Sequence, residues 1–94
     1  MTFRVELARS AARAFERAPR PERRRHERAI DSLSRNPRPS GKRVKAIQGT
    51  KDAFLRMCVG DYRIMYEVVD ADRVVLILGI IQRKDLEQWL RQHS

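Results

Sequence analysis

The sequence predicts an α+β domain in which an antiparallel sheet carries an N-terminal αα-hairpin on one face and is followed by a short C-terminal helix. The first residues alternate between polar and apolar, with the period of a half-buried strand. Two stretches then repeat apolar residues at helical spacing, and most of the second half is rich in β-branched residues around a tight turn. All 94 residues fit one domain, with the element order β-α-α-β-β-β-α.

The first third of the chain predicts one strand and then a helix. Phe3, Val5 and Leu7 alternate with polar residues, as in a strand with one buried face. From about Arg9 the apolar residues recur every three or four positions, which is typical of an amphipathic helix, and Ser10 is a possible N-cap. The apolar positions of this helix are Ala11, Ala14, Phe15 and Ala18.

Two prolines separate this helix from a second one. Pro19 breaks the first helix, and Pro21 suits the first turn of the next, so we expect a helix from about Pro21 to Arg35 that completes the αα-hairpin. Its apolar stripe comprises His26, Ala29, Ile30 and Leu33. This position favours a packing role for His26 over a role in proton transfer.

The remainder of the chain predicts strands and one short helix. The dipeptide Gly60-Asp61 is typical of a two-residue hairpin turn, and the last apolar run is rich in β-branched residues, as expected of a strand covered on both faces. The expected elements are a loop at 36–41, a short strand at 44–47, a polar turn at 48–52, strands at 54–59, 62–69 and 73–82, and a helix at 85–92.

The charge is strongly basic and unevenly distributed. Residues 1–50 hold 14 basic and 5 acidic residues, whereas residues 51–94 hold 7 of each, and the whole chain carries +9. A small basic protein usually binds a polyanion such as nucleic acid or the ribosome. We find no membrane-spanning stretch and no signal peptide, so we expect a cytoplasmic protein. One cysteine and two histidines argue against a disulfide or a zinc site, so we expect no metal or other cofactor.

The predicted hairpin brings two arginines to one face of the sheet. If Gly60 and Asp61 form the turn, Cys58 lies opposite Arg63, and Arg56 lies diagonal to Arg63, at about 7–8 Å between backbones. The other face, which includes both Tyr62 and Tyr66, would be the core face. Two cations on an open sheet face could bracket one phosphate, but the hairpin alone favours the alternative that both are solvated surface residues.

Several motifs resemble the RelE/ParE superfamily of toxins. The hairpin Val59-Gly60-Asp61-Tyr62-Arg63-Ile64-Met65-Tyr66-Glu67-Val68, the basic end Arg83-Lys84-Asp85 of the next strand, and the upstream Asn36-Pro37-Arg38-Pro39 and Gly41-Lys42 all match the RelE pattern. The resemblance covers essentially the whole chain. It implies a toxin that cuts mRNA in the ribosomal A site without a metal and is neutralised by a cognate antitoxin.

The resemblance also implies roles for individual residues. Arg63 would contact the scissile phosphate, Arg83 would stabilise developing or leaving-group charge, and Arg56 would add a third cation. The residues expected to contact RNA or the ribosome are Lys42, Arg43, Lys45, Lys51, Arg23, Arg24 and Trp89. For Arg23 and Arg24 a solvated helix face is the alternative, and for Trp89 the alternative is packing against the sheet.

The chain departs from the family pattern at three positions. Phe54 stands where some members have a basic residue. Trp89 is approximately at the position where some members have a catalytic tyrosine, and Cys58 replaces an arginine that is common in the family. These departures leave open which group exchanges protons; Lys42, Lys45, Lys51 or the ribosome could do so. Two other functions therefore stay open: a ParE-like inhibitor of DNA gyrase, and a degenerate homologue that only binds its antitoxin or RNA.

Overall fold

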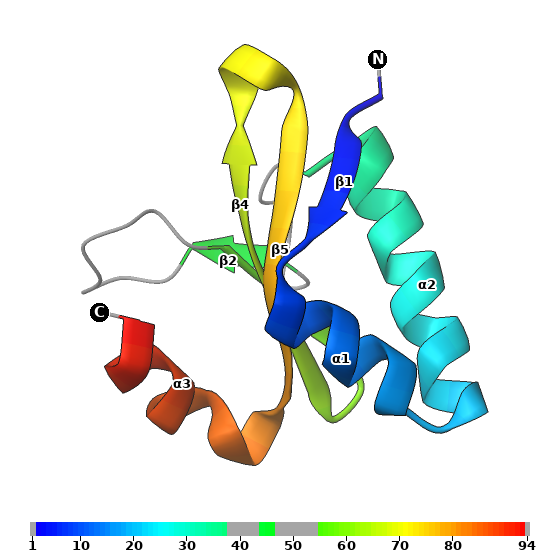
Figure 1. Cartoon of the computed structure of the whole chain (residues 1–94), viewed down its shortest axis with the longest axis vertical. Coiled ribbons are helices and arrows are strands. Elements are labelled where there is room, and N and C mark those ends of the chain that lie inside the picture. Colours follow the sequence, from blue (N-terminus) through cyan, green and yellow to red (C-terminus); the bar gives the residue numbers. More distant parts are fainter. Residues whose placement is uncertain (1, 38–43, 47–54, 94) are drawn as a thin grey trace.

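Five strands form one mixed sheet at the centre of the molecule, in the order β1-β5-β4-β3-β2 (Figure 1). The structure, a computed structural model, describes residues 2–37, 44–46 and 55–93. The elements are β1 Arg4–Leu7, α1 Arg9–Arg17, α2 Arg20–Arg35, β2 Val44–Ala46, β3 Leu55–Val59, β4 Tyr62–Val69, β5 Val74–Gln82 and α3 Leu86–His93, with 3-10 turns η1 Asp70–Asp72 and η2 Arg83–Asp85. The predicted α+β class is confirmed, and a strand is found in each of the five regions where one was predicted, although the predicted order β-α-α-β-β-β-α counts only four.

The register of the β3–β4 hairpin is the predicted one. Val59 pairs with Tyr62, Cys58 with Arg63, and the antiparallel ladder continues from there. Gly60 has a φ of +59°, a backbone conformation that side chains with a Cβ rarely adopt, so the glycine allows the tight turn. Because register in a hairpin follows from the turn, this local feature decides which side chains share a face.

The pairing of β1 differs from the prediction of a wholly antiparallel sheet. β1 runs parallel to β5, with Arg4 beside Val74 and Leu7 beside Ile77. The antiparallel expectation was therefore wrong for this edge strand. Alternation along β1 shows only that one of its faces is buried; its direction depends on how the αα-hairpin returns the chain to the sheet.

Helices cover both faces of the sheet. In Figure 1, α1 and α2 lie on one side of β5 and α3 lies on the other. The main core, between the sheet and the first two helices, comprises Ala11, Ala29, Leu33, Met57, Ile64, Tyr66, Val75, Ile77 and Ile80. On the other face Met65 and Trp89 form a second buried cluster. The prediction that β5 is covered on both faces is confirmed.

The helix boundaries agree with the prediction to within about one residue, but the predicted N-cap is wrong. The residue before α1 is Ala8, and Ser10 lies inside the helix, where its hydroxyl donates to the carbonyl of Leu78 at 3.1 Å. Ser10 thus ties α1 to β5 instead of capping it. The second helix begins at Arg20, with Pro21 in its first turn as expected.

No helix in the described part of the chain is long and apolar enough to span a membrane. The predicted loop and turn, at 36–41 and 48–52, fall almost entirely outside the described residues, as do Lys42, Arg43, Lys51 and Phe54.

Candidate functional site

The β3–β4 hairpin places Arg56 and Arg63 on the same face of the sheet. Cys58 is the partner of Arg63, and Arg56 is the partner of Met65, so the two arginines are diagonal neighbours as predicted. Met65 belongs to the cluster beneath α3, which shows that both arginines are on the α3 side of the sheet. Both are partly exposed. They can therefore meet a ligand that approaches beside α3.

Arg63 is folded back over the hairpin turn. Its Nη1 atom donates to the carbonyl of Gly60 at 3.0 Å and to the carbonyl of Tyr62 at 2.8 Å. A guanidinium has five N–H donors, so these two contacts leave donors for a ligand oxygen. The same turn approaches α2, because a Cβ placed on Gly60 would lie 3.6 Å from Nη1 of Arg25. Arg25 is thus a further cation near the site, next in the chain to Arg23 and Arg24, which were expected to bind RNA.

Arg83 borders the same turn from the end of β5. Its backbone N–H donates to the carbonyl of Asp61 at 2.7 Å, which extends the β4–β5 ladder by one more link. The arginine is exposed. Arg63 and Arg83 thus lie at the same end of the sheet, both in contact with the Gly60-Asp61 turn. Arg56 lies further along β3, away from the turn.

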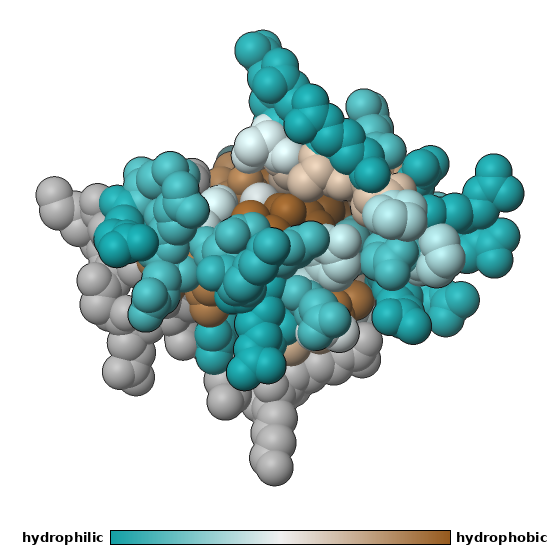
Figure 2. All heavy atoms as spheres, turned by 90° about the horizontal axis from the view of Figure 1, so that it is seen from below, coloured by the Kyte–Doolittle hydropathy of each residue, from teal (hydrophilic) through white to brown (hydrophobic). Residues whose placement is uncertain are grey.

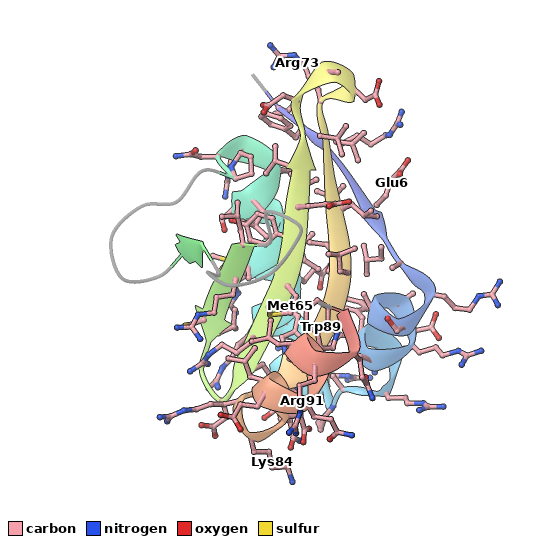
Figure 3. The ribbon with its side chains drawn as sticks, turned by 90° about the vertical axis from the view of Figure 1, so that its left-hand side faces the viewer. Glu6, Met65, Arg73, Lys84, Trp89 and Arg91 are labelled. Carbon is pink, nitrogen blue, oxygen red and sulfur yellow. The ribbon has the colours of Figure 1, made fainter. Side chains whose placement is uncertain are left out.

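The face that carries Arg56 and Arg63 is less open than the sequence suggested, because α3 packs on it. Trp89 is only 7% exposed and lies against Met65, as Figure 3 shows. The fit is close: a Cβ on Gly79 would come within 2.8 Å of the indole nitrogen of Trp89. This burial favours the packing role for Trp89 over base stacking.

The other residues expected to bind RNA differ in the contacts that they make. Arg24 is exposed on α2. Arg23 is exposed too, but its Nη2 atom donates to the carbonyls of Ala18 at 3.3 Å and Glu16 at 3.4 Å, so it helps to join the two helices of the αα-hairpin. The backbone of Lys45 is in register with Arg56 across the β2–β3 pair.

A buried hydrogen bond positions the start of the basic segment that leads to β2. The hydroxyl of Tyr66 donates to the carbonyl of Pro37 at 2.8 Å, and both residues are buried. Burial raises the pKa of Tyr66 to about 12. Tyr66 is therefore a structural residue, as predicted.

His26 is fully buried beside the site. Its ring lies edge-on to Tyr62, with centroids 4.7 Å apart and an interplanar angle of 76°. Neither ring nitrogen has a hydrogen-bond partner among the residues that the structure describes. Desolvation lowers the pKa of His26, and the nearby Glu22 carboxylate opposes this shift only in part. The predicted packing role is confirmed.

The end of the sheet that carries the turn also contains an open pocket. Its volume is about 580 Å³, within the range of small-ligand pockets, and it lies between α2, the hairpin turn and η2. The lining residues are Glu22, Asp61, Tyr62, Gln82, Arg83 and Lys84. Of these residues only Arg83 was predicted to belong to a site, because the pocket joins three segments that are far apart in the sequence, at residue 22, at 61–62 and at 82–84. Within the described ranges, no three His, Cys, Asp or Glu side chains lie together where they could hold a metal ion.

The fold is that of a small, basic α+β protein with arginines at one end of its sheet, and comparison with known proteins gives the family. The family model described as ParE toxin of the type II toxin–antitoxin system parDE matches residues 5–87. The chain belongs to this family, within the RelE/ParE superfamily.

Individual relatives agree with this assignment. The chain is 27% identical over 85 residues to toxin RelE1 of Methanocaldococcus jannaschii, covering 89% of this chain and 93% of the relative. The archaeal RelE–RelB complex of Pyrococcus horikoshii contains a chain that is 34% identical, with a TM-score of 0.75 over 88% of this chain and 97% of that one. The RelBE2 complex of Mycobacterium tuberculosis, at 24% identity, shows the shared fold, with a TM-score of 0.74 over 88% of this chain and 100% of that one.

Proposed function

We propose that this toxin is a ribosome-dependent endoribonuclease that cuts mRNA in the A site, and that it acts without a metal ion. The observation that carries the proposal is the approach of Arg63 and Arg83 to one turn, with Arg56 on the same sheet face as Arg63. Guanidinium groups suit a phosphodiester, because each can bind two of its oxygens and because its negative charge increases in the transition state of cleavage. A gyrase inhibitor has no comparable need for them.

The reaction is an attack of a ribose 2′-OH on the adjacent phosphate. A bond forms between the 2′ oxygen and phosphorus, the bond to the 5′ oxygen of the next nucleotide breaks, and a cyclic phosphate and a free 5′-OH remain. Arg63 exchanges its contacts with the turn carbonyls for non-bridging phosphate oxygens, where its planar fork can bind two oxygens at once. Arg83 stabilises the charge that develops on the leaving 5′ oxygen.

The proton acceptor is not an arginine, because the guanidinium group stays protonated in proteins. We assign this role to Lys45, whose backbone lies in register with Arg56. A proton donor for the leaving oxygen then comes from Lys42, Lys51 or the ribosome.

The relatives suggest how the activity of this toxin is inhibited. The structures from Pyrococcus horikoshii and Mycobacterium tuberculosis are toxin–antitoxin complexes, so we propose a cognate antitoxin for this chain as well. An acidic segment would complement the N-terminal half, which holds all of the chain's +9 excess charge. Because ribosomes are the proposed site of action, we also propose that the protein is cytoplasmic.

The test is a translation reaction programmed with a defined mRNA, read by mapping new 5′ ends. We expect cuts within the A-site codon that need ribosomes, and a roughly 10²–10³-fold loss of rate in each of Arg63→Ala and Arg83→Ala. Arg13→Ala, an exposed position on α1, is the matched control and should cut like the wild type. Thermal unfolding should show that all three variants are folded.

Two outcomes would contradict the proposal. Full cutting by both site variants would reject the assigned residues. Inhibition of DNA supercoiling by the purified toxin, together with intact mRNA, would favour the ParE-like function instead.

A further inference from the structure

Two hollows meet at the end of the molecule that carries the hairpin turn. The pocket described above shares Tyr62, Gln82 and Lys84 with a second hollow of about 620 Å³ between the α1–α2 link and η2. The second hollow adds apolar walls from Ala14, Ala18, Pro19, Ile80 and Ile81. Figure 2, which views this end directly, shows a hydrophobic depression ringed by hydrophilic side chains. This is the form of a site for a flat, partly apolar group.

The rim of the first pocket is chemically mixed. Arg83 and Lys84 supply positive charge, and Glu22 and Asp61 supply carboxylates. Among the described residues, these four side chains make no hydrogen bond or ion pair with one another; the one salt bridge found there joins Arg4 and Glu6 at the side of the sheet. The four groups are therefore available to a ligand that offers both an anion and hydrogen-bond donors.

A nucleotide offers both. Its phosphate would meet Arg83 and Lys84, its base would pack on the aromatic ring of Tyr62, and the edge of the base would face Gln82 and the carboxylates. Unstacked bases in RNA recognition are bound in this way, with one face on an aromatic side chain and polar groups at the edge.

The carboxylates discriminate between bases, because an ionised carboxylate only accepts hydrogen bonds. Adenine, cytosine and guanine each present an exocyclic amino group that can donate to it. Uracil has one donor on its pairing edge, flanked by two carbonyl oxygens that repel a carboxylate. The pocket should therefore disfavour uracil.

We propose that this pocket binds the nucleotide on the 3′ side of the cut and selects a base that carries an amino group. The inference rests on the proposed function, because it takes Arg83 as the residue at the leaving 5′ oxygen. That oxygen belongs to the nucleotide whose base would enter the pocket, so recognition of the base and stabilisation of the leaving group share one arginine. Glu22, Asp61 and Gln82 are then specificity residues.

His26 is a positioning residue in this scheme. Its ring supports Tyr62 edge-on from inside the core, and it makes no hydrogen bond of its own with the described residues. The contact holds the tyrosine ring between the two hollows that it lines.

The first experiment is independent of the ribosome: calorimetric titration of the free toxin with the four nucleoside 5′-monophosphates. We expect AMP, CMP and GMP to bind roughly tenfold more tightly than UMP, the effect of about one charge-assisted hydrogen bond. Glu22→Gln should reduce this difference to about threefold or less, because an amide can donate to a uracil carbonyl. Asp61→Asn, at an exposed position less coupled to folding, should act in the same direction.

The matched controls come from the same chain. Glu27→Gln lies on an exposed face of α2, and Gln88→Ala lies exposed on α3; neither should change the order of binding. In the cleavage map, uridine should be depleted immediately after the cut for the wild type, and Glu22→Gln should restore it.

The outcomes separate the two proposals. Cleavage in the A site without discrimination against UMP, or with the same discrimination in Glu22→Gln, would overturn the pocket and leave the nuclease intact. Discrimination that Glu22→Gln removes, in a protein that leaves mRNA whole, would overturn the nuclease and retain a nucleotide pocket.

Discussion

Replacing Gly79 with alanine tests the packing of α3 on the sheet. Glycine in a strand interior is intrinsically unfavourable, so an alanine with free space around it would stabilise the protein by about 0.5–1 kcal/mol. In this structure the new Cβ would lie 2.8 Å from Nε1 and 3.3 Å from Cε2 of Trp89. Both atoms belong to a ring that is 7% exposed and packed against Met65, so the ring has little room to move.

The clash reverses the expected sign of the change in unfolding free energy. Overpacking of this kind typically costs about 1–3 kcal/mol, which exceeds the intrinsic gain, so Gly79→Ala should destabilise the domain. The assay is urea denaturation followed by the fluorescence of Trp89, the one tryptophan in the sequence. Its emission should also shift to longer wavelength in the folded variant, because the indole is displaced toward water.

The control is a double-mutant cycle with Trp89→Leu, which removes the ring that the new Cβ would meet; circular dichroism replaces fluorescence in that background. There Gly79→Ala should be neutral or stabilising, with a coupling energy of about 1–3 kcal/mol between the two positions. An equal penalty in both backgrounds, or stabilisation in the wild type, would refute the docking of α3 described here.

Two further predictions concern the buried side chains of His26 and Tyr66. Because burial lowers the pKa of His26 below its ordinary value of 6.5, the unfolded chain takes up a proton more readily than the folded one. Stability should therefore fall as the pH drops through about 6.5, and His26→Leu should reduce this slope between pH 7 and 5 in denaturation curves; an unchanged slope would contradict the assignment. Tyr66→Phe removes the 2.8 Å hydrogen bond to Pro37 and leaves a buried carbonyl without this donor. We expect a loss of about 1–3 kcal/mol in unfolding free energy, and a change below about 0.5 kcal/mol would argue against the bond.

The sequence alone determined the local features of this protein. The two-residue turn at Gly60-Asp61 specified the hairpin register, and with it the shared face of Arg56 and Arg63, because strand pairing next to a tight turn follows from the turn. The proline pair set the αα-hairpin within about one residue, since proline acts on the backbone of its immediate neighbours. The superfamily followed from the same short motifs.

Only the tertiary structure decided how distant segments meet. The parallel direction of β1, the seating of α3 over Met65, and the approach of Glu22 and Arg25 on α2 to the hairpin turn depend on contacts between residues far apart in the chain. Propensity and periodicity say which face of an element is apolar, but not which partner covers that face. The pairing depends on the fit between whole surfaces, as between Gly79 and the indole of Trp89. The pocket beside Arg83 likewise exists because three separate segments, at residue 22, at 61–62 and at 82–84, were brought together.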